Sequence, residues 1–230
     1  MNSLLSPLRD WVNGDAEIPN HLRFSVFEPI THDWVALVAI HTAHLLHEVE
    51  EIIWHPYDEV WRDTRRYVDE VQKMAGQSIS IRRIQKAESQ AVIDRLGTPP
   101  PICLPLYFIS VKKDDIEKLV YVGQTTSNKR FRNGHRVCTA LHHPKFNTWS
   151  KHIYQASLCV IPIDRAIALE WLTEYETGQE VLNSVEHRLI NGLHPDLNRQ
   201  GREGDSAKWK FKVMVENWID AGFLHCETIE

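Results

Sequence analysis

Residues 184–198 hold the side chain whose surroundings most suggest chemistry, Glu186. In a helix, Glu186 would lie on an apolar stripe with four aliphatic residues, Leu182, Leu189, Ile190 and Leu193. A carboxylate among apolar side chains is costly unless a cation, hydrogen bonds or a substrate compensate it. Glu186 is therefore a candidate metal ligand. Asn198 follows twelve residues later, after a loop that contains Pro195.

A cluster of cations at residues 129–136 suggests a second kind of chemistry, the binding of an anion. It comprises Lys129, Arg130, Arg132 and Arg136, with His135 among them. The whole chain has a net charge of −5, but residues 106–212 carry 16 Lys and Arg against 12 Asp and Glu. The positive charge is thus local and indicates an anion-binding face. A solvated helix face without a ligand is the alternative interpretation.

The first half of the chain contains another set of potential metal ligands. His44, His47, Glu48 and Glu51 are spaced i, i+3, i+4 and i+7, which would place them on one face of a helix. Helical histidines beside glutamates also form ordinary surface hydrogen bonds, and no second helix offers a matching ligand motif. A structural role is the favoured interpretation of this set.

Hydrophobic periodicity predicts the elements that must position these residues. Helices are expected in the first part of the chain, over residues 34–54 and 58–71. Residues 97–101, Gly-Thr-Pro-Pro-Pro, then mark a boundary, because consecutive prolines cannot continue a helix. Beyond it we expect antiparallel strands over 105–111 and 118–124, a third strand over 152–163, and helices over 132–142, within 165–193 and over 208–221.

The order of these motifs resembles the GIY-YIG nuclease superfamily over about residues 104–200. PLYFISV and VYVGQT match its two strand motifs, KRFRNGHR its basic segment, and HPDLN the loop after its glutamate-bearing helix. Pro105 stands where the first motif usually has glycine. The resemblance implies an α/β (α+β) fold over residues 102–230, with a small antiparallel three-stranded sheet flanked by helices. Residues 1–98 would form a helical N-terminal extension that shapes target recognition or dimerisation.

The site residues implied by the resemblance are Tyr107, Tyr121, Arg130, His135, Glu186 and Asn198, with Arg132 as the alternative to Arg130. Glu186 would bind a Mg²⁺ or Mn²⁺ ion, which neutralises charge on the scissile phosphate. Tyr107 would take a proton from the attacking water, and Tyr121 and His135 would hold and tune the site. The arginine would grip the phosphate, and Asn198 would orient the loop beside the metal.

The implied activity is metal-dependent hydrolysis of phosphodiester bonds, foremost in double-stranded DNA, as in a restriction or defence endonuclease. One set of site residues cuts one strand, so a homodimer or transient pairing on DNA is expected. A catalytically weak nucleic-acid-binding module and an RNA-cleaving or repair nuclease are the alternatives, because contacts to phosphate do not identify the base.

Composition sets the class of protein and its expected location. At 230 residues and 43% apolar composition, the chain can bury a full core. Its longest apolar segment, residues 34–54, is interrupted by histidines and glutamates, so no membrane span is expected. The first residues show no secretory signal. The cysteines Cys103, Cys138, Cys159 and Cys226 are widely spaced, which predicts reduced thiols and a cytoplasmic protein.

Overall fold

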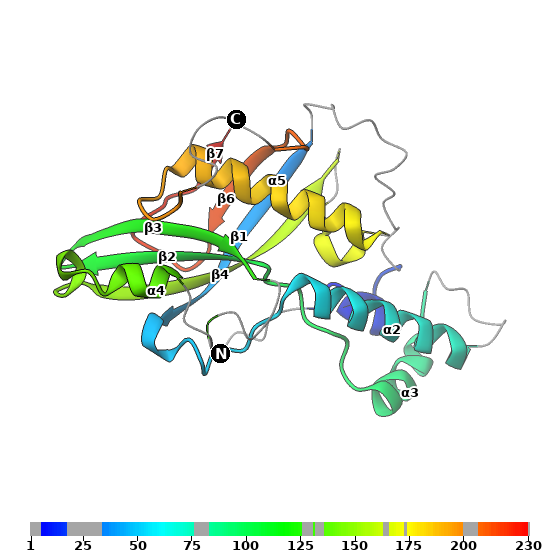
Figure 1. Ribbon diagram of the computed structural model, residues 1–230. Helices are drawn as coiled ribbons and strands as arrows, with labels where there is room; N and C mark the ends of the chain where they lie inside the picture. The colour runs from blue at the N-terminus through cyan, green and yellow to red at the C-terminus, as the bar shows by residue number, and fades with distance from the viewer. Residues whose placement is uncertain are drawn as a thin grey trace.

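The computed structural model describes residues 6–17, 34–75, 83–125, 131, 136–162, 166–172, 174–199 and 207–229. In these ranges the chain forms a mixed seven-stranded sheet with helices around it (Figure 1). The strands are β1 (Val35–Leu45), β2 (Leu106–Lys113), β3 (Ile116–Gln124), β4 (Ser150–Ile161), β5 (Ile167–Ala168), β6 (Lys212–Asn217) and β7 (Glu227–Ile229). The α-helices are α1 (Arg9–Val12), α2 (Tyr57–Ala75), α3 (Lys86–Leu96), α4 (Arg136–Leu141) and α5 (Tyr175–Leu193). Short 3-10 turns are η2 (Leu46–Glu48), η4 (Pro144–Phe146) and η5 (Leu169–Trp171).

Three strands at one end of the sheet confirm the expected strand positions. β2 lies between β3 and β4 and pairs with both in antiparallel fashion, with Leu106 opposite Gln124 on one side and Ala156 on the other. Each of these strands is rich in β-branched and aromatic residues, which suit a pleated and half-buried surface. The strands predicted over 105–111, 118–124 and 152–163 are therefore confirmed.

The prediction of a small three-stranded sheet is wrong. The sheet continues from β4 to β1, β6 and β7. The two-residue strand β5 pairs with Cys159 and Val160, near the end of β4. β1 is antiparallel to β4 and parallel to β6. Residues 34–54, predicted as a helix, instead begin with this eleven-residue strand, because the buried residues Ala36, Val38 and Ile40 recur with the period of a strand. The expected helical extension thus contributes a strand to the common sheet.

The prediction of a closing helix over residues 208–221 is also wrong. This segment contains β6, in which Val213 and Val215 are buried while Met214 between them is partly exposed. Alternation with a period of two is typical of a strand that covers a core on one face. The helix predicted over 58–71 is confirmed by α2, whereas the others are found in part: α4 covers the second half of 132–142, and α5 lies within 165–193.

The two faces of the sheet carry separate hydrophobic cores. On the first face, α5 packs against the sheet through a cluster that includes Leu106, Phe108, Val122, Leu182, Val185 and Leu189. On the second face, a cluster includes Tyr107, Ile109, Trp54, Phe131 and the α4 residues Val137 and Leu141. Successive side chains of a strand point to opposite faces. Tyr107 therefore belongs to the face of α4, whereas its neighbours in β2 face α5.

A third cluster joins α1, α2 and α3 beside the sheet (Figure 1). It is built from apolar residues of all three helices together with the η5 tryptophan, including Trp11, Val68, Val71, Val92 and Trp171. In the part of the chain described by the structure, we find no helix that is both long and apolar enough to cross a membrane.

Glu117, near the start of β3, ties the sheet to the turn after β6. Its Oε1 accepts hydrogen bonds from Ser110 Oγ and Tyr154 Oη, each at 2.5 Å, and its Oε2 accepts one from the Gly222 N–H at 2.8 Å. Burial on its own raises the pKa of this carboxyl, but the three hydrogen bonds, with a contribution from His152, outweigh burial and lower the pKa. The folded protein therefore favours the ionised form.

We expect Glu117→Gln to destabilise the fold by about 1 kcal/mol at pH 7, since a partly exposed charge-assisted network weakens. Folding lowers this pKa, so the contribution of the carboxylate is present above its unfolded pKa of about 4.3 and is lost as the pH falls through the folded value. Thermal unfolding of both proteins at pH 7, 5 and 3 measures the difference, which should shrink toward pH 3. Glu227→Gln, at an exposed position of β7, is the control. A difference that is constant over this range would contradict the expectation.

Candidate functional site

Tyr107 and Gly123 make an unusually close contact between β2 and β3. The two residues are paired across the strands, and the phenol of Tyr107 occupies the space that a side chain at position 123 would need. A Cβ on Gly123 would lie 2.6 Å from both Cζ and Oη of Tyr107, and 2.7 Å from Cε1 of Tyr121. The two tyrosine rings are stacked, with centroids 5.9 Å apart. Glycine is therefore required here for the two phenols to gather at the edge strand β3.

The two phenols differ in their access to solvent. Tyr107 is completely buried, with Trp54 and Phe131 packed around it at centroid distances of 6.1 and 5.2 Å. Tyr121 is partly exposed. In this conformation Tyr121 presents the more accessible hydroxyl group. The Tyr107 hydroxyl can contact a substrate-bound water only if the packing around it opens.

Asn198 fastens the loop after α5 to the same strand. The helix ends at Leu193, its C-cap His194 has a left-handed φ of 48°, and the chain then turns toward β3. The Leu197 N–H donates to the Val120 carbonyl at 2.8 Å. The Asn198 side chain pairs with both backbone groups of Val122, accepting from its N–H at 2.9 Å and donating to its carbonyl at 2.8 Å. Asn198 thus acts on the outer edge of β3 as a short additional strand would.

We expect Asn198→Ala to cost about 2–6 kcal/mol of stability, because two buried backbone groups of Val122 lose their partners at about 1–3 kcal/mol each. Urea unfolding measures the change. Asn183→Ala is the matched control, since this exposed asparagine accepts hydrogen bonds only from glutamine side chains in the described contacts, those of Gln124 and Gln179. Equal stability of the two variants would show that the Asn198 side chain contributes little.

Glu186 lies on the side of α5 that faces the edge of β3. Gln179 Nε2 donates to Gln124 Oε1 at 3.0 Å, and Gln124 Nε2 donates to Asn183 Oδ1 at 2.6 Å. Glu186 follows Asn183 by three residues and so lies on the same side of the helix. It is half-buried, beside the buried apolar residues of the helix, which are Val181, Leu182, Val185, Leu189 and Ile190. Glu186 as a residue is thus partly exposed rather than fully enclosed by apolar packing.

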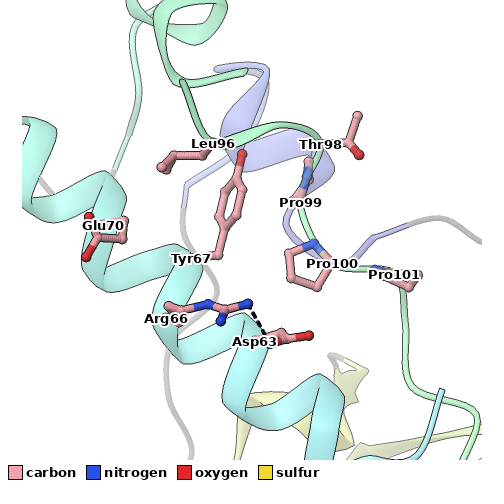
Figure 2. Close-up of a pocket in the computed structure, with 9 residues that line it drawn as sticks. All are labelled: Asp63, Arg66, Tyr67, Glu70, Leu96, Thr98, Pro99, Pro100 and Pro101. Carbon is pink, nitrogen blue, oxygen red and sulfur yellow. Dashed lines mark hydrogen bonds and ion pairs between the residues drawn. The ribbon is translucent and has the colours of Figure 1, made fainter. Parts of the chain in front are cut away.

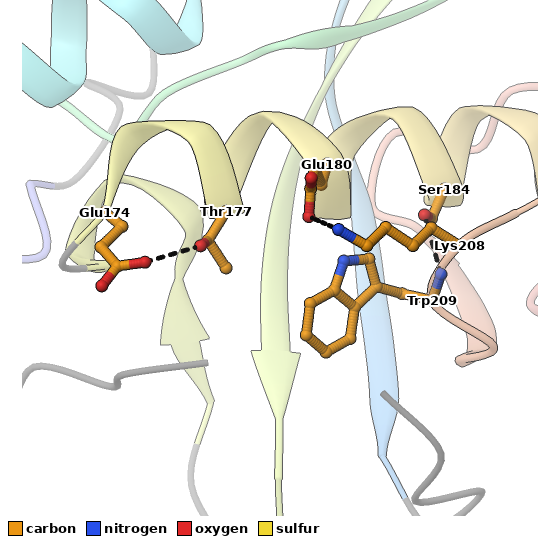
Figure 3. Close-up of polar contacts among 6 residues, drawn as sticks. All are labelled: Glu174, Thr177, Glu180, Ser184, Lys208 and Trp209. Carbon is orange, nitrogen blue, oxygen red and sulfur yellow. Dashed lines mark hydrogen bonds and ion pairs between the residues drawn. The ribbon is translucent and has the colours of Figure 1, made fainter. Parts of the chain in front are cut away.

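Further contacts fix the rotation of α5. Lys208 Nζ lies 2.6 Å from Glu180 Oε2, and the Trp209 N–H donates to Ser184 Oγ at 3.1 Å (Figure 3). At the start of the helix, Thr177 Oγ1 donates to Glu174 Oε2 at 3.1 Å. Glu180 therefore faces Lys208 in the segment before β6. Glu180 and Glu186, two of the three glutamates of this helix, have different surroundings.

Of the basic segment 129–136, the structure describes only Phe131 and Arg136. Arg130, Arg132 and His135 lie outside the residues that the structure describes, so their positions relative to Tyr107 stay predictions. Phe131 is described and is buried, with its ring stacked on Trp54 at 5.2 Å. Because Phe131 also contacts Tyr107, the chain between the two arginines is anchored beside the tyrosine pair.

The second set of potential metal ligands does not form the expected helix face. His44 lies in β1, whereas His47 and Glu48 lie in the turn η2. Across the ranges that the structure describes, no group of three or more His, Cys, Asp or Glu side chains could hold a metal ion. A cation would therefore depend on few protein ligands in these ranges. Mg²⁺ tolerates this, because it commonly binds one or two carboxylates and completes its shell with water and phosphate oxygens.

A hollow of about 360 Å³ between α2 and the proline-rich linker is an alternative candidate site (Figure 2). Its lining includes Asp63, Arg66, Tyr67 and Pro99–Pro101. Arg66 forms an ion pair with Asp63 at 2.8 Å, and the Tyr67 hydroxyl donates to the Gly97 carbonyl at 3.0 Å. The ion pair neutralises the charge of Arg66, and the hydrogen bond of Tyr67 fixes the proline-rich linker. We therefore assign this hollow a structural role.

Sequence reasoning missed the contacts that define the site's geometry. The glycine two residues after Tyr121 was a usable signal, since an isolated glycine in a strand often marks a close approach. The pairing of Gln124 with α5 carried no sequence signal.

No protein-family model matches the sequence, no curated protein is found to be similar, and no solved structure matches the fold.

Proposed function

We propose that the protein is a metal-dependent endonuclease of the GIY-YIG type that hydrolyses phosphodiester bonds of double-stranded DNA. The observation that carries the proposal is the phenol of Tyr107 lying against Gly123 and stacked on Tyr121. The Tyr107 ring occupies the space that a side chain at position 123 would need. The phenol rings of Tyr107 and Tyr121 therefore lie together at the edge strand β3. Asn198 and α5 both contact the outer edge of β3, and because α5 and the tyrosine pair lie on opposite faces of the sheet, the proposal requires Glu186 to act around this edge.

The proposed roles follow from the chemistry of each group. Tyr107, as a phenolate favoured by the neighbouring arginine and metal ion, accepts a proton from the attacking water, and Tyr121 holds that water in position. Glu186 is the metal ligand, and a bound Mg²⁺ or Mn²⁺ ion supplies charge neutralisation at the phosphate. Arg130, with Arg132 as the alternative, binds phosphate oxygens, and His135 tunes the site. Asn198 keeps the loop after α5 on β3.

A catalytically weak module that binds nucleic acid is the second candidate. The complete burial of Tyr107 favours it, because a general base must come within hydrogen-bond reach of the water it activates. The proposal of an active nuclease therefore includes an opening of the packing around Tyr107 when the substrate binds. Cleavage of plasmid DNA separates the two candidates.

The setting we propose is that of a restriction or defence enzyme in the cytoplasm, acting as a homodimer or as two chains that meet on DNA. Cutting both strands requires two sites of this kind. All four cysteines, of which Cys103 is buried and Cys226 exposed, are free thiols, and this fits a reducing compartment.

Incubation with supercoiled plasmid tests the activity. We expect nicked and linear products with Mg²⁺ or Mn²⁺ and none with excess EDTA, because the ion is needed at the phosphate. Parallel digestion of structured RNA tests the substrate class. Failure to cut DNA with either ion, by folded protein that still binds DNA, would favour the weak binding module.

A further inference from the structure

A hollow of about 500 Å³ opens beside α4, next to the candidate site. It is lined by Thr139, Ala140, His142, His143, Lys145 and Leu197. Leu197 is held on β3 by its bond to Val120 and directly precedes Asn198. The residue also packs with the hydrophobic cluster that contains Tyr107 and Tyr121. The hollow therefore lies on the same sheet face as the tyrosine pair.

The hollow lies in the part of the chain that is free of acidic residues. Residues 118–163 contain no Asp or Glu, although 31 acids in 230 residues would place about six in any stretch of 46. The same stretch holds seven Lys and Arg and four His. Asp196 beside Leu197 is exposed, is not part of the lining, and is followed by Arg199. The lining contributed by residues 139–145 is therefore basic, and its charge favours an anion.

The cationic side of the hollow is built on a rigid turn. Lys151 Nζ donates to the carbonyls of Phe146 and Trp149, at 3.1 and 3.3 Å, which fixes η4 to the start of β4. The Lys145 N–H donates to His143 Nδ1 at 3.3 Å, so a neutral His143 ring carries its proton on Nε2 and offers a donor there. The Lys145 ammonium lies 4.5 Å from the ring centroid of the buried Phe146. Because the turn beneath these cationic side chains is held in place, they lose little conformational entropy when they bind an anion.

We propose that this hollow binds a backbone phosphate of duplex DNA, beside the phosphate that is cut. Its hydroxyl, imidazole and ammonium groups are the donors that proteins use on phosphate oxygens. The hollow is open and shallow, which suits a ridge of backbone rather than an enclosed small molecule. The position beside the cut phosphate rests on the proposed nuclease function, whereas the binding of DNA by the hollow does not.

Fluorescence anisotropy with a labelled 20-base-pair DNA duplex in EDTA tests this proposal without cleavage. The variants are His143→Ala with Lys145→Ala, and the charge reversal Lys145→Glu. The control is Lys210→Ala with His225→Ala, which removes one exposed lysine and one exposed histidine elsewhere. All four positions are exposed, and only His143→Ala removes a hydrogen bond of the turn, so the unfolding temperature should stay unchanged for Lys145→Glu and the control and fall slightly for the double variant. We expect about tenfold weaker binding for the first variant, more for the second, and a salt slope shallower by about 0.9 for each phosphate that the variant no longer binds.

These outcomes test DNA binding by the hollow separately from the proposed nuclease activity. Weaker binding and a shallower slope in the hollow variants alone support the hollow, even if the wild type cuts no DNA. Normal binding by Lys145→Glu, or an equal loss in the control, overturns the hollow even if the wild type cuts plasmid. Tighter binding of a duplex RNA of the same length would overturn the assignment to DNA.

Discussion

Replacing Glu186 with glutamine is expected to lower Mg²⁺-dependent cleavage of plasmid DNA by about 10²–10³-fold, since the proposed metal ligand loses its charge. Glutamine keeps the shape of the side chain, so its half-buried position can be retained. We therefore expect a change in the free energy of unfolding within about 0.5 kcal/mol. Single-turnover cleavage and urea unfolding measure the two effects.

Glu180→Gln is the matched control for this prediction. It removes a carboxylate from the same helix, but one that faces Lys208 and the segment before β6. Its ion pair is exposed, so it contributes little to stability and nothing to the proposed site. Cleavage by Glu186→Gln at the rate of Glu180→Gln would remove Glu186 from the mechanism. A loss in both variants would point to the helix rather than to the ligand.

The strands near the site could be predicted because their signal is local. β2 and β3 each contain a run of β-branched and aromatic residues, and the polar segment between them is short enough for a hairpin. β1 could not be predicted in the same way. Its apolar residues fit a helix or a strand, and its pairing with β4 and β6 involves residues more than a hundred positions away. Tertiary pairing decided this segment.

The chain does bury a carboxyl group, but not the one that helical spacing indicates. Glu186 is half-buried, whereas the fully buried carboxyl of the described chain is Glu170 in η5. Glu170 accepts hydrogen bonds from the N–H and Sγ of Cys103, at 3.2 and 3.0 Å, and burial raises its pKa. The apolar residues around Glu170 are brought together by the fold rather than by helical spacing. Periodicity can find a polar residue on a helix stripe, but it cannot find one enclosed by a turn.

The hydroxyl group of Tyr107 is the second feature on which the proposed chemistry depends. Tyr107→Phe is expected to reduce cleavage by about 10²–10⁴-fold, the usual contribution of a general base. The ring, with its contacts to Trp54, Phe131 and Tyr121, is unchanged, so the loss of stability should be about 1 kcal/mol, that of one buried polar group. Cleavage rates under single-turnover conditions and thermal unfolding measure the two effects.

Tyr121→Phe is the companion variant, because Tyr121 stacks on Tyr107 but is partly exposed. A smaller loss of cleavage is expected for it, since its proposed role is to hold the water rather than to accept the proton. A larger loss in Tyr121→Phe than in Tyr107→Phe would move the role of base to the more accessible phenol. In that case Tyr107 would serve to position Tyr121 through their stacking, and the contact with Gly123 would be structural. The order of the two losses thus decides whether the packing around Tyr107 has to open during the reaction.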